Sequence, residues 1–458
     1  MAIAVLDIGK SNAKAIVLDE AGEPLARRSR PCTILPGPPY PHLDLDGLWD
    51  WALAALRELA RVAPIDCIVP VTHGAAGVLM AGDAPALPAL DYEHPGPDAR
   101  AAALLPQLDR FTDTGSPALP FGLCLGAQVD WLEHGHPAAF AAATDFLPLP
   151  QYWAWRLSGV KAVEVTSLGA HTHLWRPAER RYSDLVHRRG WGRLFPPLRS
   201  AWDWLGPVRP EVAAATGLPS DCAVLAGIHD SNASFLPHLL ARPAPFTVLS
   251  TGTWIIAMAT GVGLERLDEQ ADVIANVDAR GDPVPTARFM GGREVELVAG
   301  ADALHAVVDP LDVATIVADE VMALPNFVAG NGPFIGRQGR IVGNPGPAPA
   351  RRAALASLYA ALMVDVMLDK LGAPGPVLIE GSFHRNAAFC GLLAALRPAQ
   401  AVHATEDPSG TTRGAWLLAR WQSSPRIPGA LAPPVRPWAV EGLPRYRDGW
   451  LHASRAER

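Results

Sequence analysis

The stretch LDIGKSN near the N-terminus contains Gly-Lys-Ser, the ending of the P-loop that binds nucleotide phosphates. A P-loop also needs a glycine five positions before Gly9, where Ala4 stands, and a helix that begins at the lysine. The following NAKAIVLDEAGEP is instead typical of a strand that ends in a turn. We therefore predict a β-hairpin with Asp7 at its mouth. Its turn amides, with Lys10 and Ser11, could bind phosphate, or the turn could be an ordinary polar one.

A second strand-turn-strand pattern, FTVLSTGTWIIAMATG, begins at about residue 246. The two hairpins lie roughly half the chain apart, and each opens a region of alternating strands and helices, which suggests an internal duplication. Further on, GPVLIEGSFHRNAAFCGLLAALRP predicts a strand, a turn at Gly381-Ser382 and a helix. The two hairpins could hold two ends of a polyphosphate and the third turn a base or ribose. Alternatively, a chain with 41 glycines contains such turns by chance.

Asp230 follows the apolar run AVLAGI and precedes a helical stretch, with His229 beside it. Ligands of α/β sheets gather at the carboxyl ends of strands, which favours a catalytic carboxylate here. Aspartate is also a favoured helix cap. However, Ser231, Asn232 and Ser234 could each cap the same helix, so both interpretations stay open.

At 458 residues the chain is too long for one ordinary core, and we expect two domains. Helical spacing alternates with strand patterns, which predicts an α/β architecture; the helical stretches are 46–62, 98–109, 124–134 and 150–158. We expect an N-terminal domain over 1–240, a C-terminal domain over 241–440 and a tail over 441–458. Past about residue 425 the chain is rich in proline, and we expect it to wrap over the surface.

The composition and charge of the chain argue against some classes of binding partner and location. A net charge of −7 argues against nucleic acid. The five scattered cysteines favour reduced thiols in a cytoplasmic protein. We expect no signal peptide, because the N-terminus runs directly into a strand. The uncharged run FTVLSTGTWIIAMATGVG is broken by Ser, Thr and Gly, so we do not interpret it as a membrane span.

The segments LDIGKSNAK, GIHDSNAS, LSTGTWIIAM and EGSFHRN resemble, in this order, the FGGY family of carbohydrate kinases. The resemblance covers nearly the whole chain, and HDSNAS and STGTW look most like the L-rhamnulokinase and L-fuculokinase branch. QYWAWRLSGVKAVEVTSLGAHTHLW also resembles the family's first domain. The family implies an α/β fold with two ribonuclease-H-like domains of the actin, Hsp70 and sugar-kinase type around an interdomain cleft.

By this resemblance the protein is expected to phosphorylate a sugar hydroxyl with ATP and Mg²⁺. The sugar would be a ketose or deoxyketose similar to L-fuculose or L-rhamnulose. Asp230 would be the general base and, with Asp7, would hold the magnesium ion. The other ATP contacts would come from the first hairpin, the second hairpin and the adenosine turn: Gly9, Lys10, Ser11 and Asn12; Ser250, Thr251, Gly252 and Thr253; Gly381, Ser382 and Asn386.

Sugar contacts are expected from residues at strand ends and loops: His73, Gly74, Asp91, Tyr92, Gln128, His229 and Asp230. The alternative for each is a loop or core residue without contact to substrate. Arg293 and Glu294 are either a substrate contact or a surface ion pair. The chain departs from the family pattern at Lys10, where a small residue or threonine is more usual, and at Glu380, which replaces a glycine.

Two other functions compete with the sugar kinase. An ATPase switch of the actin or Hsp70 type uses similar hairpins, with water as the phosphate acceptor and no sugar phosphorylation. A sugar sensor without catalysis is disfavoured by the presence of Asp7 and Asp230. The expected partner is a small-molecule sugar, without nucleic acid or membrane; assembly as a homodimer is left open.

Overall fold

The computed structural model describes residues 2–405, 410–422 and 432–456. The chain divides into two compact units. Unit 1 contains 1–240, 275–283 and 409–427, and unit 2 contains 241–274, 284–408 and 428–458. The boundary after residue 240 predicted from the sequence coincides with the first crossing between units. The predicted domains do not include the two later returns of the chain to unit 1, and the expected separate tail is counted with unit 2.

Unit 1 is built on a mixed sheet whose strand order is β14-β15-β6-β1-β2-β3, and β16 also pairs with β6. Strand β1 pairs antiparallel with β2 and parallel with β6, and β15 is parallel to β6. The bounds are β1 Ala2–Ile8, β2 Asn12–Leu18, β3 Pro24–Pro31, β6 Ile65–Thr72, β14 Trp204–Pro207, β15 Ala223–Leu225 and β16 Ile228–His229. The carboxyl ends of β1, β6 and β16 therefore meet at one edge of the sheet.

Unit 2 repeats this arrangement in a sheet of order β19-β20-β18-β17-β23-β24. Here β17 and β18 form the antiparallel hairpin, and β23 and β24 add the parallel strands. The bounds are β17 Phe246–Thr251, β18 Ile255–Thr260, β19 Val273–Val277, β20 Pro283–Phe289, β23 Val377–Gly381 and β24 Val402–Ala404. The internal duplication predicted from the two hairpins is thus visible as a shared core order, β3-β2-β1-β6-β15 in unit 1 and β20-β18-β17-β23-β24 in unit 2, to which β14 and β19 add at opposite edges.

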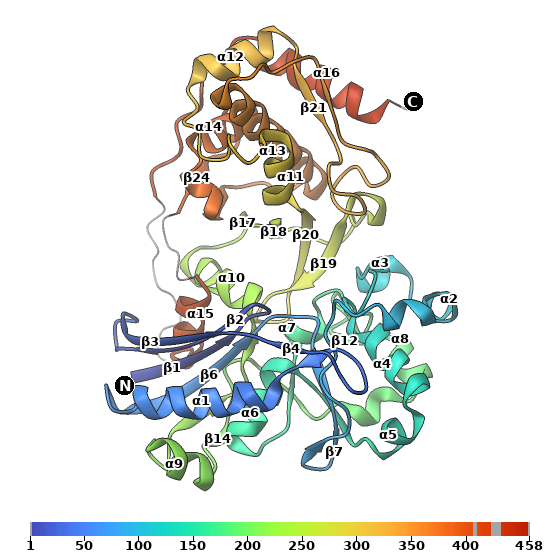
Figure 1. The fold of residues 1–458 in the computed structure, drawn as a ribbon, viewed down its shortest axis with the longest axis vertical. Coiled ribbons are helices and arrows are strands. Elements are labelled where there is room, and N and C mark those ends of the chain that lie inside the picture. The colour runs from blue at the N-terminus through green and yellow to red at the C-terminus, as the bar shows by residue number, and fades with distance from the viewer. Residues whose placement is uncertain (1, 406–409, 423–431, 457–458) are drawn as a thin grey trace. The chain divides into compact units, whose positions relative to one another are not determined.

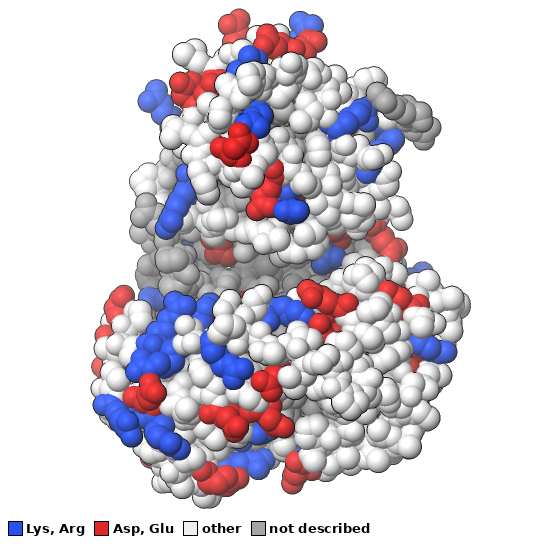
Figure 2. Space-filling view, in the orientation of Figure 1, with Lys and Arg blue, Asp and Glu red and all other residues white. Residues whose placement is uncertain are grey.

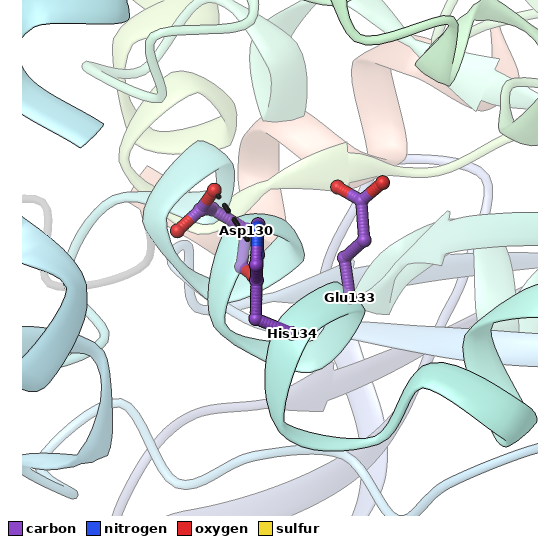
Figure 3. A group of neighbouring side chains, drawn as sticks. All are labelled: Asp130, Glu133 and His134. Atoms are coloured by element: carbon purple, nitrogen blue, oxygen red, sulfur yellow. Dashed lines mark hydrogen bonds and ion pairs between the residues drawn. The ribbon is translucent and has the colours of Figure 1, made fainter. Parts of the chain in front are cut away.

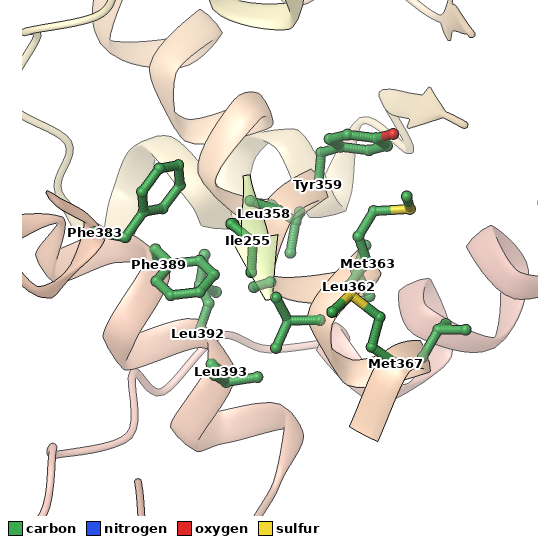
Figure 4. Packing of buried hydrophobic residues seen from close by; sticks show 14 of the residues in the cluster. Ile255, Leu358, Tyr359, Leu362, Met363, Met367, Phe383, Phe389, Leu392 and Leu393 are labelled. Atoms are coloured by element: carbon green, nitrogen blue, oxygen red, sulfur yellow. The ribbon is translucent and has the colours of Figure 1, made fainter. Parts of the chain in front are cut away.

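Apolar helices cover these sheets. In unit 1, α1 (Leu45–Leu59) and α6 (Leu149–Ser158) pack on the sheet through residues such as Leu56 and Trp153. Helix α15 (Gly410–Ala419) lies beside β1 and β6, as Figure 1 shows. In unit 2, α13 (Pro349–Leu371) is buried along most of its length, and α14 (Ala387–Leu396) packs on it. Figure 4 shows leucine and methionine side chains of α13 gathered with Ile255 and Phe389.

One expectation about secondary structure is corrected. The stretch 98–109 forms only the short α2 (Ala101–Leu104) between 3-10 turns, because prolines at 97 and 106 interrupt a longer helix. The stretches 46–62, 124–134 and 150–158 appear as α1, α4 (Leu125–Gly135) and α6. None of the helices in the described ranges has the length and apolar content needed to cross a membrane.

The C-terminal segment does not wrap over the surface along its whole length. Helix α16 (Leu443–Arg455) buries Leu443, Tyr446 and Trp450 in the core of unit 2. The Trp450 indole donates to the carbonyl of Ala323 at 2.6 Å, so the ring is held in place. The three side chains are spaced at helical intervals and form one apolar face. Residues 423–431, where the proline-rich stretch begins, lie outside the described residues.

Basic side chains cluster at one edge of the unit 1 sheet. Figure 2 shows blue side chains over the region of β3, a strand that carries Arg27, Arg28 and Arg30. Arg28 pairs with Glu58, and a guanidinium nitrogen of Arg30 lies 3.4 Å from the Asp44 carboxylate. Charged side chains on an edge strand oppose pairing with a strand of another chain.

Candidate active site

The turn between β1 and β2 is the hairpin that the sequence predicts. The amide of Gly9 donates to the carbonyl of Asn12 at 3.0 Å, and a Cβ atom at Gly9 would lie 3.2 Å from that oxygen. Ser11 and Asn12 are exposed in the turn. A neighbouring strand braces it, since the Cys32 amide donates to the Ser11 carbonyl at 2.9 Å. The turn is therefore held in shape while its tip faces solvent.

Asp7 ends the buried strand β1, and only 7% of its surface is exposed. Burial raises the pKa of its carboxyl group above the usual range; Lys14, whose Nζ lies 3.3 Å from Oδ2, opposes this shift, and the charge of Asp230 adds to it. The carboxylates of Asp7 and Asp230 interact electrostatically. They are suitable ligands for Mg²⁺, which binds few protein carboxylates together with water and phosphate oxygens.

Asp230 is the first residue of α10 (Asp230–Ala241), directly after β16. Its Oδ1 accepts hydrogen bonds from the amide of Ser231 at 2.6 Å and from the Ser231 hydroxyl at 3.3 Å. An N-cap side chain would accept from the amide two or three residues further on, which is a different contact. One third of the side chain is exposed, so the carboxylate can reach a ligand.

His229 is held beside this carboxylate. Its Nε2 lies 3.3 Å from Oδ1 of Asp230, and its Nδ1 lies 2.9 Å from Oδ1 of Asn232. The Asn232 amide in turn donates to the carbonyl of Val277. A Cβ atom at position 74 would lie 2.6 Å from Nε2 of His229, so Gly74 is needed for this approach. The imidazole is thus fixed from both sides.

A buried hydrogen-bond chain supports the backbone of His229. Thr166 Oγ1 accepts the His229 amide at 3.2 Å and donates to Oε2 of Glu164 at 2.5 Å. Glu164 also caps the short α7 (Val165–Leu168), accepting the amides of Thr166 at 3.0 Å and Ser167 at 3.4 Å. Glu164 and Thr166 were not predicted as part of the site. The signal was present in Glu-Val-Thr-Ser, where an acidic residue precedes a short helix.

The predicted sugar contacts Asp91 and Tyr92 lie against His73 and Lys10. The rings of His73 and Tyr92 are 5.6 Å apart at 72°, an edge-to-face contact. The ammonium group of Lys10 forms an ion pair with Asp91 and lies 4.3 Å from the Tyr92 ring centroid. Burial lowers the pKa of His73 and raises the pKa of Tyr92 to about 12. Both groups are therefore neutral donors or acceptors at neutral pH.

Gln128, another predicted sugar contact, is fully buried. Its amide nitrogen donates to the carbonyls of Ala75 at 2.8 Å and Gly122 at 2.5 Å, so it ties two loops together. Its Oε1 is buried and has no hydrogen-bond partner in the part of the chain that the structure describes. The side chain therefore supports the loop that follows His73 and Gly74, with one acceptor unused.

In unit 2 the second hairpin is as predicted. The Gly252 amide donates to the Trp254 carbonyl at 2.8 Å, and the Gly292 amide donates to the Thr253 carbonyl at 3.1 Å. The Thr251 hydroxyl donates to the Glu380 carbonyl and accepts the amide of Phe383 at 3.0 Å, so it serves the fold. Gly381 has φ of 81°, and a side chain there would collide with the Thr251 carbonyl. Ser250 is partly exposed, and Thr253 lies exposed in the turn.

A cavity of about 410 Å³ lies in unit 2 next to the third turn. Of the predicted adenosine residues, Ser382 and Asn386 line it, and Gly381 does not. Asn386 caps α14 by accepting the Phe389 amide at 2.9 Å, and its Nδ2 donates to the Ser357 hydroxyl at 3.1 Å. None of the other lining residues was predicted from the sequence; they include Val295, Ala299, Leu304, His305, Val308, Ala353, Ala356, Ser357, Arg385 and Ala387.

Arg293 and Glu294 do not form the surface ion pair that was one expectation. Arg293 pairs instead with Glu296, with 2.8 Å between nitrogen and oxygen. Glu294 is fully buried, accepts the hydroxyl hydrogen bond of Tyr359, and has its pKa raised by burial. The helical spacing places residues 293 and 296 on one face, whereas 294 points into the core.

Asp130, Glu133 and His134 on α4 lie close enough to hold a metal ion (Figure 3). Arginines already neutralise two of them: Asp130 lies 3.1 Å from Arg100 and 2.8 Å from Arg189, and Glu133 lies 2.6 Å from Arg189. This cluster is therefore an ion-pair network that holds α4, and a cation would have to displace the arginines.

Two copies of one hairpin-bearing sheet, the first with Asp7 and Asp230 at its strand ends and the second beside a cavity, define an α/β fold of two related units. Two domain families match the chain: "FGGY family of carbohydrate kinases, N-terminal domain" over residues 111–236 and "Carbohydrate kinase FGGY, C-terminal domain" over residues 243–426. The crystal structure of a carbohydrate kinase from Novosphingobium aromaticivorans is 38% identical, with a TM-score of 0.91, covering 99% of this chain and 100% of that one. The chain belongs to the FGGY family of carbohydrate kinases.

Curated relatives agree with the branch predicted from the sequence. The chain is 27% identical over 273 residues to L-fuculokinase from Salmonella typhi, covering 56% of each. It is 23% identical over 218 residues to rhamnulokinase from Halalkalibacterium halodurans, covering 46% of this chain and 45% of that one. The chain thus spans about half the length of the curated relatives it matches. The resemblance to the FGGY family and to this branch, and the two-domain α/β fold, are confirmed.

Proposed function

We propose that this protein transfers the γ-phosphoryl group of ATP to a hydroxyl group of a ketose or deoxyketose similar to L-fuculose or L-rhamnulose. The observation that carries the proposal is the placement of Asp230 at the end of β16, held by His229 and electrostatically coupled to Asp7. Asp230 would accept the proton of the attacking hydroxyl. A positioned carboxylate of this kind typically accelerates such a step by about 10²–10⁴-fold.

The sugar would lie against the side chains around Asp230, where His73 and Asp91 present polar groups from buried positions and Tyr92 from a half-buried one. Gly74 has no side chain, which leaves space for the His229 ring beside these residues. Gln128 would act mainly by holding the Ala75 loop. A bound sugar would displace water from beside Asp230, so its hydroxyl group would compete well with water as the acceptor.

We propose ATP contacts in each unit considered by itself: the first hairpin in unit 1, and the second hairpin and the cavity in unit 2. Exposed or half-buried residues at the two hairpins could contact phosphate oxygens, as residues of anion-binding turns do; these residues are Gly9, Ser11 and Asn12 in the first hairpin and Ser250, Gly252 and Thr253 in the second. The cavity of about 410 Å³ has mainly small apolar lining residues with Ser382, Asn386 and His305, which suits a base and ribose.

Asp7 and Asp230 would hold Mg²⁺. The bound ion would neutralise charge on the phosphates, which is a main requirement of phosphoryl transfer. Lys14 lies beside Asp7 and balances part of its charge before the ion binds. We further infer a cytoplasmic location, where ATP is supplied; all five cysteines are free in the structure, which suits a reducing compartment. A homodimer remains an open proposal.

The alternative is an ATPase switch that uses water as the acceptor. ADP release with Mg-ATP, measured with and without a panel of ketopentoses, ketohexoses and their deoxy forms, tests the choice. A sugar kinase would be stimulated strongly by one or a few sugars, with one phosphosugar formed per ADP. ADP release that no sugar changes would favour the switch and contradict the proposed function.

A further inference from the structure

Lys10 lies in the first hairpin, where it was expected to bind ATP phosphates, but its side chain has other partners. Its ammonium group pairs with the carboxylate of Asp91 and lies 3.7 Å from Oε2 of Glu93. It also sits 4.3 Å from the centroid of the Tyr92 ring. All three partners belong to the segment that carries the predicted sugar contacts. The Lys10 side chain therefore points toward the proposed sugar-binding residues His73, Asp91 and Tyr92 of unit 1, which we call the sugar wall.

This pair is largely shielded from water. The side chain of Lys10 is 19% exposed and that of Asp91 is 9% exposed. Asp91 is also fixed at its backbone and side chain, since its amide donates to the Pro41 carbonyl at 3.0 Å and its Oδ1 accepts the Glu93 amide at 3.2 Å. A lysine ammonium has three N–H donors and a carboxylate has two acceptor oxygens. The contacts of Lys10 with Asp91 and Glu93 therefore leave at least one N–H donor on Lys10, and Oδ2 of Asp91 is left as an acceptor for a ligand.

The charges around Lys10 and Asp91 favour an uncharged ligand over an anion. The four carboxylates of Asp7, Asp91, Glu93 and Asp230 outnumber the cations that act on them among the described residues, which are Lys10, Lys14 and, for Asp7, Arg27. This excess of negative charge disfavours a second anion, such as a sugar acid carboxylate or the phosphate of a phosphorylated sugar. Adjacent sugar hydroxyl groups fit better, because one can accept from the ammonium while the other donates to the carboxylate.

We infer that Lys10 and Asp91 form a dyad that binds two neighbouring hydroxyl groups of an uncharged sugar, and that Lys10 is not a phosphate ligand. This inference rests on the proposed function for its substrate but concerns binding and not the phosphoryl step. Lys10 then helps to determine which sugar binds, because its ammonium group reaches from the hairpin next to Asp7 to the sugar wall.

Two variants and one control test the dyad. Lys10→Met keeps the length and apolar stem of the side chain, and Asp91→Asn keeps its shape. Lys161→Met is the matched control, because Lys161 forms a comparable pair with Asp145 at 2.5 Å elsewhere in unit 1. For each protein, isothermal titration measures binding of the stimulating ketose and of ATP separately. Steady-state kinetics give the two KM values, and thermal melting checks folding.

We expect Lys10→Met and Asp91→Asn each to weaken sugar binding by about 10–100-fold, as for loss of a charged hydrogen bond. ATP affinity should change by less than about two-fold, and Lys161→Met should bind both ligands like the parent. The parent should bind the neutral ketose and not the matching sugar acid. If Lys10→Met instead weakens ATP binding and keeps sugar affinity, Lys10 is a phosphate ligand and the inference is wrong.

If the protein binds a sugar but the sugar does not stimulate ADP release, the proposed function is wrong. The inference about Lys10 is then still decided by the titration of sugar and ATP binding to Lys10→Met. Failure of the folded parent to bind any neutral ketose, or tighter binding of the sugar acid, would overturn the inference. If Lys10→Met melts early, Asp91→Asn decides, since its carboxamide keeps the hydrogen bond to the Glu93 amide but loses the charge.

Discussion

The Nε2 atom of His229 lies 3.3 Å from Oδ1 of Asp230, and Nδ1 of the same ring lies 2.9 Å from Oδ1 of Asn232. The imidazole therefore links a partly exposed carboxylate to a fully buried amide. Asn232 is anchored in turn on the Val277 carbonyl. This chain of contacts fixes the side chain next to the proposed base, and it gives Asn232 a role in orienting Asp230 without contact to substrate.

Replacing Asn232 by alanine should disturb this orientation. Loss of one hydrogen bond to His229 is worth about 1 kcal/mol, so kcat for the stimulating sugar should fall about five-fold while KM for ATP stays unchanged. Because the Val277 carbonyl also loses its donor, the variant should be less stable by roughly 1–2 kcal/mol.

Ser234→Ala is the control for Asn232→Ala. Ser234 lies on the same helix, but its hydroxyl bonds to Thr411 at 2.7 Å, away from His229. Rapid kinetics and urea denaturation should show a normal kcat in the control. A normal kcat in Asn232→Ala would mean that His229 does not depend on this contact.

The unit 2 cavity should be sensitive to its volume. Ala387 is exposed at the start of α14 and lines the cavity, so Ala387→Leu can place a larger side chain in its mouth without disturbing the core. We expect KM for ATP to rise about ten-fold, a modest steric penalty, with sugar affinity and melting temperature nearly unchanged.

Ala54→Leu provides the matched control, because Ala54 is exposed on α1 in unit 1. Initial-rate measurements over a range of ATP concentrations would distinguish the two variants. An Ala387→Leu protein with the ATP KM of the parent would indicate that the nucleotide binds elsewhere.

Glu164 should make stability depend on pH. Burial raises the pKa of its carboxyl group to about 7, against hydrogen bonds from Thr166 and Ser167 that favour the charged form. The unfolded chain has an ordinary glutamate pKa of about 4.3. The folded protein therefore holds the proton more tightly. Its stabilising contribution is complete below the unfolded pKa and is lost as pH rises through about 7.

Glu164→Gln removes this titration while keeping the side-chain shape. Relative to the variant, the parent should lose on the order of 3 kcal/mol of unfolding free energy between pH 5 and pH 8. Urea midpoints recorded across this range give the difference. Parallel pH curves for the two proteins would show that Glu164 keeps the same protonation state throughout.

The parts of the site that the sequence predicted have local signals. The hairpin at Gly9 follows from a glycine turn between two apolar strand patterns, and the position of Asp230 follows from the strand-to-helix change around it. The same local signals, repeated near residue 250, indicated the duplicated sheet. The distribution of helices also followed periodicity, except at 98–109, where prolines divide the helix.

The parts that the sequence did not predict depend on contacts between distant residues. Lys10 and Asp91 are 81 residues apart, and Thr166 and His229 are 63 apart, so no local pattern pairs them. The burial of Trp450 was not predicted, because the proline-rich stretch before α16 indicated a surface segment and drew attention away from the helical spacing that follows. Asn386 matched a binding motif, but its side chain also caps α14, and only the fold reveals this second use.

The central claim is that Asp230 is the catalytic base of a sugar kinase, and Asp230→Asn tests it most directly. Asparagine keeps an oxygen that can accept from Ser231, so melting should change little; the same holds for Asp44→Asn, because asparagine caps a helix about as well as the Asp44 that caps α1. Sugar-dependent ADP release is the measurement. We expect Asp230→Asn to lower turnover by on the order of 10²-fold or more with only a modest loss of sugar affinity, and Asp44→Asn to keep full turnover. A correctly folded Asp230→Asn protein with the turnover of the parent would contradict the account.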